Sequence, residues 1–359
     1  MTVPGLRRYC VARFRRAAGL LAATALLAAC VAFTSRQQVV TLQRTEQQSG
    51  TNERLIAVSA VNRNVVWASG LHGTYTVTTD GGATWKAGQV PGAEDLDLRD
   101  VQGVSATTAY VLSVGPGKRA KIFKTDNAGA TWMTKFTNID AALHWKCLSF
   151  WNPLHGVAIS DALEGGFIMM STVDGGWTWN RVPPLSLPAA VPDERVSAES
   201  GTCVVAGRSG RTWIGTTKLH VLRSTNYGAS WRRAYVPITK TDSTGIVSLA
   251  FRDKTRGMAL GQFATSPTDT LVAFTDDGGE NWTTRALQPL MTEISAGAFV
   301  PGLAGPTVLV VGPQGSSYSR DGGAKWERID TVAYNGVAFA GRAAGWAVGL
   351  NGRITKFSF

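Results

Sequence analysis

The amino-acid sequence predicts an all-β protein, folded as a single seven-bladed β-propeller. Three observations support this prediction: an eight-residue motif recurs six times, a short apolar segment ending near glycine recurs seven times, and 40 of the 359 residues are glycine. Charged residues make up only 17% of the chain. Many short strands joined by tight turns have such a composition, and a repeat of roughly 40 to 50 residues is typical of a propeller blade.

The repeated motif follows the template Ser/Thr, any residue, Asp/Asn, any residue, Gly, two further residues, Trp. Its first copy is TTDGGATW, and its tryptophans lie 47, 47, 52, 51 and 44 residues apart. The acceptor and indole residues of the six copies are Asp80 and Trp85, Asn127 and Trp132, Asp174 and Trp179, Asn226 and Trp231, Asp277 and Trp282, and Asp321 and Trp326.

We interpret the motif as a structural turn between the third and fourth strands of a blade. The Asp or Asn oxygen accepts backbone N–H groups of the same turn, the glycine allows a positive φ, and the indole covers the space between blades. Asn127 and Asn226 keep the acceptor and lose the charge, which a turn tolerates and a catalytic acid does not. The six motifs are therefore expected to stabilise the blades rather than to form active sites.

The remaining strands complete seven units. Apolar second strands are expected at 65–70, 109–115, 156–160, 212–215, 257–261, 308–312 and 345–349. The seventh unit ends after three strands, so residues 38–44 are expected to supply its outer strand, because closing the ring protects the sheet edge. The predicted blades are 53–91, 95–140, 142–187, 197–238, 244–290, 294–330 and 333–359, within a propeller that spans residues 38–359.

Residues 1–29 have the features of an export signal. Arginines without acids precede an apolar run of 17 residues, Ala17 to Phe33. The tetrad ending in Cys30, Leu-Ala-Ala-Cys, resembles the lipobox of bacterial lipoproteins, in which the cysteine receives a diacylglycerol. The alternatives are an ordinary signal peptide or an uncleaved anchor, for which the run is slightly short. We expect an exported, periplasmic lipoprotein tethered at Cys30, with residues 30–37 as a linker.

The charge of the chain argues against nucleic acid as a partner. The formal net charge is +11, and removal of the five leader arginines leaves 11 − 5, or +6, without a dense basic run. An acidic protein face, an anionic lipid or a glycan suits this charge equally well.

The six motifs and seven strand segments together resemble the Asp-box (bacterial neuraminidase repeat, BNR) β-propellers. This family includes sialidases, xyloglucanases, sortilin-type receptors and photosystem II stability/assembly factors. The last group is the most similar in size and layout: its members are single exported propellers without catalytic residues that hold a membrane-protein subunit during assembly. The resemblance implies a non-catalytic propeller that binds a protein partner in the cell envelope.

Ligands of propellers usually contact the loops around the central channel, here at the end opposite the Asp-box turns. We expect Arg99, Lys118 and Arg119 to form a partner-facing basic patch. The other candidates for ligand or partner binding are Asp100, Trp145, Lys146, Asp161 and Glu199.

A glycan-active or glycan-binding protein is the alternative hypothesis. Asp161, Glu164 and Glu199, with Glu194 nearby, would supply the acid pair that glycoside hydrolysis needs, and Trp145 would be a stacking platform. We favour a simpler interpretation, in which these acids are solvated or pair with cations such as Arg99 and Lys146.

Known catalytic signatures give the enzyme hypothesis little support. The Arg-Ile-Pro motif of sialidases is absent, and xyloglucanases of this repeat class carry two propellers. The sequence contains no nucleophile elbow, no phosphate-binding glycine loop and no zinc-ligand spacing. No cofactor and no metal are indicated.

Two cysteines remain in the propeller, Cys147 and Cys203. Both are aligned with a small-residue position of the first strand, which Val58, Val101, Ser248, Ala296 and Gly336 fill in the other blades. Equivalent positions on neighbouring inner strands are not hydrogen-bonded partners, and a disulfide needs Cα atoms within about 7 Å. We therefore expect two buried thiols, with a disulfide as the alternative that export permits.

Overall fold

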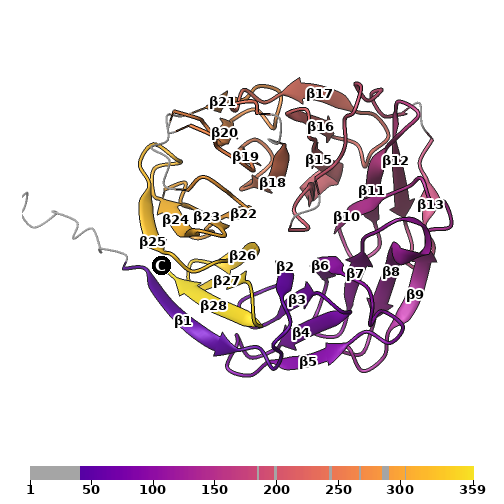
Figure 1. Ribbon diagram of the computed structural model, residues 1–359, viewed down its shortest axis with the longest axis horizontal. Coiled ribbons are helices and arrows are strands. Elements are labelled where there is room, and N and C mark those ends of the chain that lie inside the picture. The colour runs from indigo at the N-terminus through magenta and orange to yellow at the C-terminus, as the bar shows by residue number, and fades with distance from the viewer. Residues whose placement is uncertain are drawn as a thin grey trace, which may run out of the picture. The chain divides into compact units, whose positions relative to one another are not determined.

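The computed structural model describes residues 41–183, 186–197, 200–241, 245–266, 268–284, 291–303 and 305–359. The chain divides into Met1–Thr41 and Leu42–Phe359, and the second unit consists of seven four-stranded antiparallel sheets set around a central channel (Figure 1). The predicted all-β class and seven-bladed propeller are confirmed. The leader, Cys30 and the linker lie outside the described residues. Within the described ranges, no helix is long and apolar enough to cross a membrane.

Each of blades 1 to 6 runs outward from the channel in chain order. Their strands are β2 (Leu55–Ala60), β3 (Val66–Gly70), β4 (Thr74–Thr78) and β5 (Lys86–Gln89); β6 (Leu98–Gly103), β7 (Ala109–Ser113), β8 (Lys121–Thr125) and β9 (Met133–Thr137); β10 (Trp145–Phe150), β11 (Gly156–Leu163), β12 (Gly166–Thr172) and β13 (Asn180–Arg181); β14 (Val204–Gly207), β15 (Arg211–Gly215), β16 (His220–Ser224) and β17 (Arg232–Tyr235); β18 (Ile246–Phe251), β19 (Gly257–Gly261), β20 (Val272–Thr275) and β21 (Thr283–Thr284); and β22 (Ala296–Phe299), β23 (Val308–Gly312), β24 (Gly315–Ser319) and β25 (Glu327–Asp330).

Blade 7 combines both ends of the propeller. β26 (Gly336–Gly341), β27 (Ala344–Val348) and β28 (Arg353–Ser358) are completed by β1 (Gln43–Gln48), which pairs antiparallel with β28 (Figure 1). Closure by an N-terminal strand is confirmed, but the strand begins later than the expected residues 38–44.

Side chains fix the observed register of β1. The Gln47 Oε1 atom accepts hydrogen bonds from the indole N–H groups of Trp85 and Trp346, each at 3.1 Å. The remaining residues of β1 are largely exposed. An outermost strand at the solvent edge needs no apolar side chains, so hydrophobicity does not mark where β1 begins.

The core lies between adjacent blades. Trp67 of β3 and Tyr75 of β4 pack against Trp132, the indole of the next blade's Asp-box, with ring centroids 6.3 and 5.0 Å from it. The Tyr75 hydroxyl also donates a hydrogen bond to the Gly129 carbonyl of that box, at 2.7 Å. The Asp-box thus joins each turn to the neighbouring blade.

The first Asp-box has the expected turn hydrogen bonds. The Asp80 carboxylate accepts the Thr84 N–H at 2.9 Å, the Thr84 hydroxyl at 2.6 Å and the Thr78 hydroxyl at 2.7 Å, while Gly82 N–H donates to the Thr78 oxygen at 2.9 Å. The hydroxyl and N–H of Thr84 and the hydroxyl of Thr78 hold the pKa of Asp80 well below its ordinary value. Gly82 has a φ of 90°, which favours glycine there.

The Asn copies use the same geometry with one bond reversed. The Asn127 Oδ1 atom accepts the Thr131 N–H at 2.8 Å, and its Nδ2 group donates to the Thr131 hydroxyl at 2.8 Å. In the second Asn copy, Asn226 makes the equivalent bonds to Ser230 at 3.0 and 2.9 Å. A hydroxyl can donate or accept, so the turn forms with either side chain.

Candidate functional site

The Asp-box turns and the loops expected to bind a partner lie at opposite ends of the blades. In blades 1 to 5, the box turn is hydrogen-bonded to the hairpin between the first and second strands, for example Gly81 N–H to the Asn64 carbonyl at 2.9 Å and Gly175 N–H to the Leu154 carbonyl at 2.8 Å. The opposite end carries the loops that enter the first strand and those that join the second strand to the third. We call this end the mouth.

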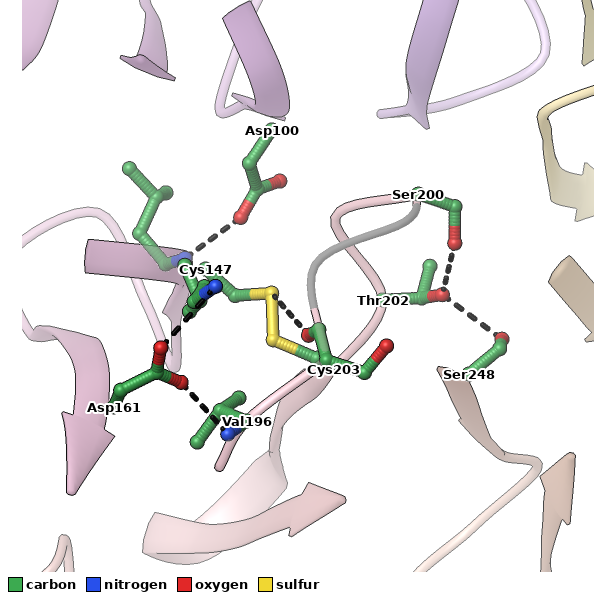
Figure 2. The surroundings of a disulfide bond; sticks show 11 residues. Asp100, Cys147, Asp161, Val196, Ser200, Thr202, Cys203 and Ser248 are labelled. Atoms are coloured by element: carbon green, nitrogen blue, oxygen red, sulfur yellow. Dashed lines mark hydrogen bonds and ion pairs between the residues drawn. A yellow bond between two sulfur atoms is a disulfide. The ribbon is translucent and has the colours of Figure 1, made fainter. Parts of the chain in front are cut away.

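Cys147 and Cys203 form a disulfide, with Cα atoms 6.2 Å apart (Figure 2). The expectation of two free thiols is wrong. Neighbouring inner strands converge at the channel, where β10 lies against β14, so side chains at equivalent positions can meet without backbone hydrogen bonds between them.

The positions equivalent to Cys147 on the seven inner strands form a ring around the channel, and the strand register corrects the predicted alignment of this ring. The inner strands of blades 1, 2, 3 and 5 contain a β-bulge near their start, which the repeat pattern does not show. The residues equivalent to Cys147 in blades 1 and 2 are therefore Ala57 and Asp100, opposite Ser69 and Leu112, instead of Val58 and Val101.

Asp100 links blades 2 and 3 from this ring. Its side chain is buried, and its Oδ2 atom accepts the Leu148 N–H at 2.6 Å (Figure 2). Burial raises the pKa of Asp100 well above its ordinary value, despite this hydrogen bond. Asp100 lines the channel cavity with its carboxyl group engaged between the blades, and its role in ligand binding stays a prediction.

Hydroxyl groups form similar side-chain links between the inner strands of blades 4, 5 and 6. The Thr202 hydroxyl lies 2.8 Å from that of Ser200 and donates to the Ser248 hydroxyl at 2.8 Å (Figure 2). The Ser248 hydroxyl accepts the Gly297 N–H at 3.3 Å. With Asp100 and the disulfide, side chains thus connect the inner strands of blades 2 to 6. They border a cavity of about 240 Å³ in the channel, lined mainly by small residues.

Asp161 forms an ion pair with Lys146, as the simpler interpretation of the mouth acids predicts. Its carboxylate lies 3.2 Å from the Lys146 ammonium and accepts the Val196 N–H at 2.9 Å (Figure 2). Only 12% of the Asp161 side chain is exposed, and Lys146 is 24% exposed. Glu164 is exposed at the tip of the β11–β12 hairpin, and Glu199 lies outside the described residues.

Glu194 is the centre of a polar network that the sequence did not indicate. Its side chain is fully buried and accepts the Thr216 hydroxyl at 2.7 Å, while its carboxylate lies 2.8 Å from His220 Nδ1 and 3.3 Å from Arg233 Nη2. Burial opposes ionisation, but the Thr216, Val191 N–H and His220 hydrogen bonds and the Arg233 charge outweigh it and lower the pKa of Glu194. The partners lie on three separate segments of blade 4, so no local motif connects them.

Trp145 does not offer a stacking surface. It is 2% exposed and packs between blades 2 and 3, with its ring edge-on to Phe136 at 5.3 Å. The expectation of a glycan platform at Trp145 is wrong, because the first residue of β10 turns its indole into the core.

The three bases of the predicted patch, Arg99, Lys118 and Arg119, lie at the mouth. Lys118 and Arg119 are exposed on the short turn between β7 and β8, where the Arg119 guanidinium donates to the Asp95 carbonyl at 2.6 Å. Arg99 is one-third exposed and lies 3.8 Å from the Asp97 carboxylate. The patch therefore contains acids as well as bases. Over the described ranges, no group of three or more His, Cys, Asp or Glu residues is placed to hold a metal ion.

Comparisons with known proteins relate the chain to solved propellers only. No family profile and no curated protein sequence matches it. YCF48 from Cyanidioschyzon merolae matches with a TM-score of 0.64 at 17% identity, over 88% of this chain and 98% of that one. YCF48 bound to a D1 peptide matches with a TM-score of 0.59 at 17% identity, over 89% and 97%. The chain shares its fold with YCF48. The predicted resemblance to the photosystem II assembly-factor group is thus confirmed at the level of structure.

YCF48 is one of several propellers with similar scores. A GH74 xyloglucanase from Xanthomonas campestris has a TM-score of 0.57 at 14% identity, and this chain spans 53% of it. The structure of U3-55K reaches 0.61 at 9% identity. Because proteins with such different names share the architecture, the likeness to YCF48 establishes the propeller and leaves its ligand to be argued from this chain's own residues.

Proposed function

We propose that this chain is an exported, lipid-anchored, non-catalytic propeller that binds a protein partner in the cell envelope and acts as an assembly or stability factor. The observation that carries the proposal is the engagement of the acids near the mouth. Asp161 is bound to Lys146, Glu194 is buried among Thr216, His220 and Arg233, and Asp100 is buried against blade 3.

These environments are unsuited to glycoside hydrolysis. A catalytic acid pair needs two carboxyl groups that face one substrate bond, one of them protonated near neutral pH. Glu194 has a lowered pKa and no exposed side-chain surface, and the carboxyl group of Asp161 is occupied by an ammonium and a backbone N–H. Asp161 and Glu194 instead stabilise the loops that surround the channel.

A polypeptide ligand is consistent with the layout of the mouth. One YCF48 structure has a D1 peptide bound, so a propeller of this architecture can hold a segment of another protein. In this chain, the exposed Lys118 and Arg119 on blade 2 supply positive charge. We assign them to the partner-facing patch, together with Arg99.

The membrane attachment in this proposal rests on Cys30 and the basic, apolar segment before it. Replacing Cys30 by Ala should release the protein from membranes or block its processing. Fractionation of cells that produce each form, followed by immunoblotting, tests this part separately. Unchanged processing and membrane attachment of the Cys30→Ala protein would contradict lipidation.

Affinity purification from solubilised envelope membranes tests the partner proposal. We expect the full chain to recover a membrane protein, and Lys118→Glu with Arg119→Glu to lose most of it. Lys325→Glu is the matched control, because Lys325 is exposed at the Asp-box end. Recovery that is equal in the two charge-reversed proteins would contradict binding at the mouth.

An activity screen distinguishes this proposal from a glycan-active protein. The chain should not hydrolyse aryl glycosides or polysaccharides. Hydrolysis that Glu199→Gln abolishes would replace the proposal.

A further inference from the structure

A second hollow lies at the Asp-box end of the propeller, away from the mouth. It has a volume of about 600 Å³ and lies between the hairpin that follows β14 in blade 4 and the end of β18 with its following loop in blade 5. Its main lining residues are Arg208, Arg211, Arg252, Lys254, Phe251 and Trp213. Volumes of roughly 300 to 1,000 Å³ are usual for small-molecule sites. We call it the basic pocket.

The basic pocket carries an excess of positive charge. Four of its lining residues are cations, and Asp253 is the lining acid. Asp253 is already engaged: its carboxylate accepts the Thr255 N–H at 2.9 Å and hydroxyl at 2.8 Å, and pairs with the Arg256 guanidinium at 2.7 Å. Although burial acts in the opposite direction, these bonds hold the pKa of Asp253 well below its ordinary value.

The four lining cations have no acidic partner among the residues that the structure describes. Across the described part of the chain, none of Arg208, Arg211, Arg252 and Lys254 forms an ion pair. The corresponding hairpins of the other blades contain far fewer bases, with Arg63 in blade 1 and Arg342 in blade 7. Positive charge concentrated in a concave site attracts anions.

An aromatic wall adjoins these cations. The partly exposed Phe251 ring stacks on Trp213 at 3.6 Å, with 12° between the ring planes. Trp213 is 2% exposed and its indole N–H donates to the Gly278 carbonyl at 2.7 Å, which fixes its position. A Cβ atom at Gly207 would lie 2.8 Å from the Trp213 ring, so the backbone of blade 4 approaches this wall closely.

We propose that the basic pocket binds an organic phosphate, with the phosphomonoester on the arginines and a flat or apolar body against Phe251. Guanidinium groups bind phosphate through paired hydrogen bonds. A dianion matches the local excess of three positive charges, four cations less one acid, better than a single carboxylate does. The site is independent of the partner-facing patch at the mouth.

The phosphate source is either a free metabolite or a lipid headgroup, and calorimetric titration of the full chain in detergent distinguishes them. The probes are AMP for a free organic phosphate and dihexanoyl phosphatidic acid for a headgroup, with adenosine and dihexanoyl phosphatidylcholine as matched controls. We expect AMP or the phosphatidic acid to bind and both controls to fail. Arg211→Gln and Arg252→Gln should each weaken binding at least tenfold, and Arg63→Gln should leave it unchanged.

Lys254→Gln is the third pocket variant. It is included because Arg252 also contacts the Leu303 carbonyl at 3.5 Å, so the loss of Arg252 affects that loop. Each variant is checked by thermal unfolding. Binding of AMP alone identifies a free organic phosphate, and binding of phosphatidic acid alone identifies a lipid headgroup. Two results would overturn the proposal: neither phosphate compound binds more tightly than its control, or their binding is equal in wild type and all three pocket variants.

Discussion

Cys147 on the inner strand of blade 3 is bonded to Cys203, which directly precedes the inner strand of blade 4. Between the two cysteines along the chain lies the long segment that carries Glu194, Val196 and Ser197. The Cys147 Sγ atom also lies 3.8 Å from the Ser197 carbonyl. The disulfide therefore fastens both the channel wall and the loop that follows blade 3.

Removing this disulfide should destabilise the propeller. We expect Cys147→Ser with Cys203→Ser to lower the free energy of unfolding by about 2–4 kcal/mol, the usual contribution of a disulfide. Guanidinium unfolding with and without dithiothreitol measures this loss of unfolding free energy. The reductant should shift the wild-type midpoint and leave that of the double variant unchanged. A wild-type midpoint that is insensitive to reductant would contradict a structural role.

Asp100→Asn should stabilise the protein at neutral pH. An acid whose pKa is raised by folding resists ionisation, so wild-type stability falls as the pH rises above the ordinary pKa of Asp towards the folded value. Asn keeps an acceptor for the Leu148 N–H and does not ionise. Each unit by which the pKa is raised is worth about 1.4 kcal/mol. Urea unfolding at pH 4 and pH 8 should show that Asp100→Asn has a higher free energy of unfolding than wild type, with the larger difference at pH 8. A lower free energy of unfolding for the variant at pH 8 would contradict a buried, neutral carboxyl group.

Glu194→Gln should have the opposite pH dependence. The folded pKa of Glu194 is lowered, so its stabilisation is present above the ordinary pKa of Glu and is lost as the pH falls through the folded value. At pH 7 we expect a loss of about 3 kcal/mol, because a buried charge cluster loses one partner. Glu164 is an exposed residue at the same mouth, so the free energy of unfolding of Glu164→Gln should equal that of the wild type. Equal stability of the two variants would show that the network is not structural.

Asp80→Ala and Asp80→Asn should separate the contribution of the hydrogen-bond acceptor to stability from that of the negative charge. The Ala variant loses every bond to Thr84, so its Tm should fall. The Asn variant should keep most of the Tm, because Asn127 and Asn226 fill the same place in other blades. Because the folded pKa of Asp80 is lowered, the carboxylate stabilises the fold at pH values above the ordinary pKa of Asp, and this stabilisation is lost as the pH falls. The Tm of the Asn variant should therefore fall less on acidification than that of the wild type. Differential scanning calorimetry at pH 3 and pH 7 measures both effects.

Repetition made the fold predictable from the sequence. Six motifs with a fixed template located the blades, and the variation between Asp80 and Asn127 showed that the motif needed an acceptor and not an acid. The outer closing strand was placed too early, because β1 is exposed and held by Gln47 rather than by apolar residues.

The site was less predictable because its contacts connect distant segments. Asp100 and Cys147 are both the third residue of their inner strands, directly after the bulge, and only the strand register shows this equivalence. Glu194 reaches His220 and Arg233 from another loop. Hairpin bases in blades 4 and 5 were visible in the sequence, but only the pairing of blades shows that they line one pocket.

Photocrosslinking in intact producing cells tests the central claim most directly. A photoreactive amino acid replaces Lys118 at the mouth or, as the control, Lys325 at the Asp-box end, and crosslinked products are identified by mass spectrometry. The account predicts that the Lys118 position captures a membrane protein of the envelope and that the Lys325 position does not. Capture of the same protein from both positions, or from neither, would contradict a propeller that binds its partner at the mouth.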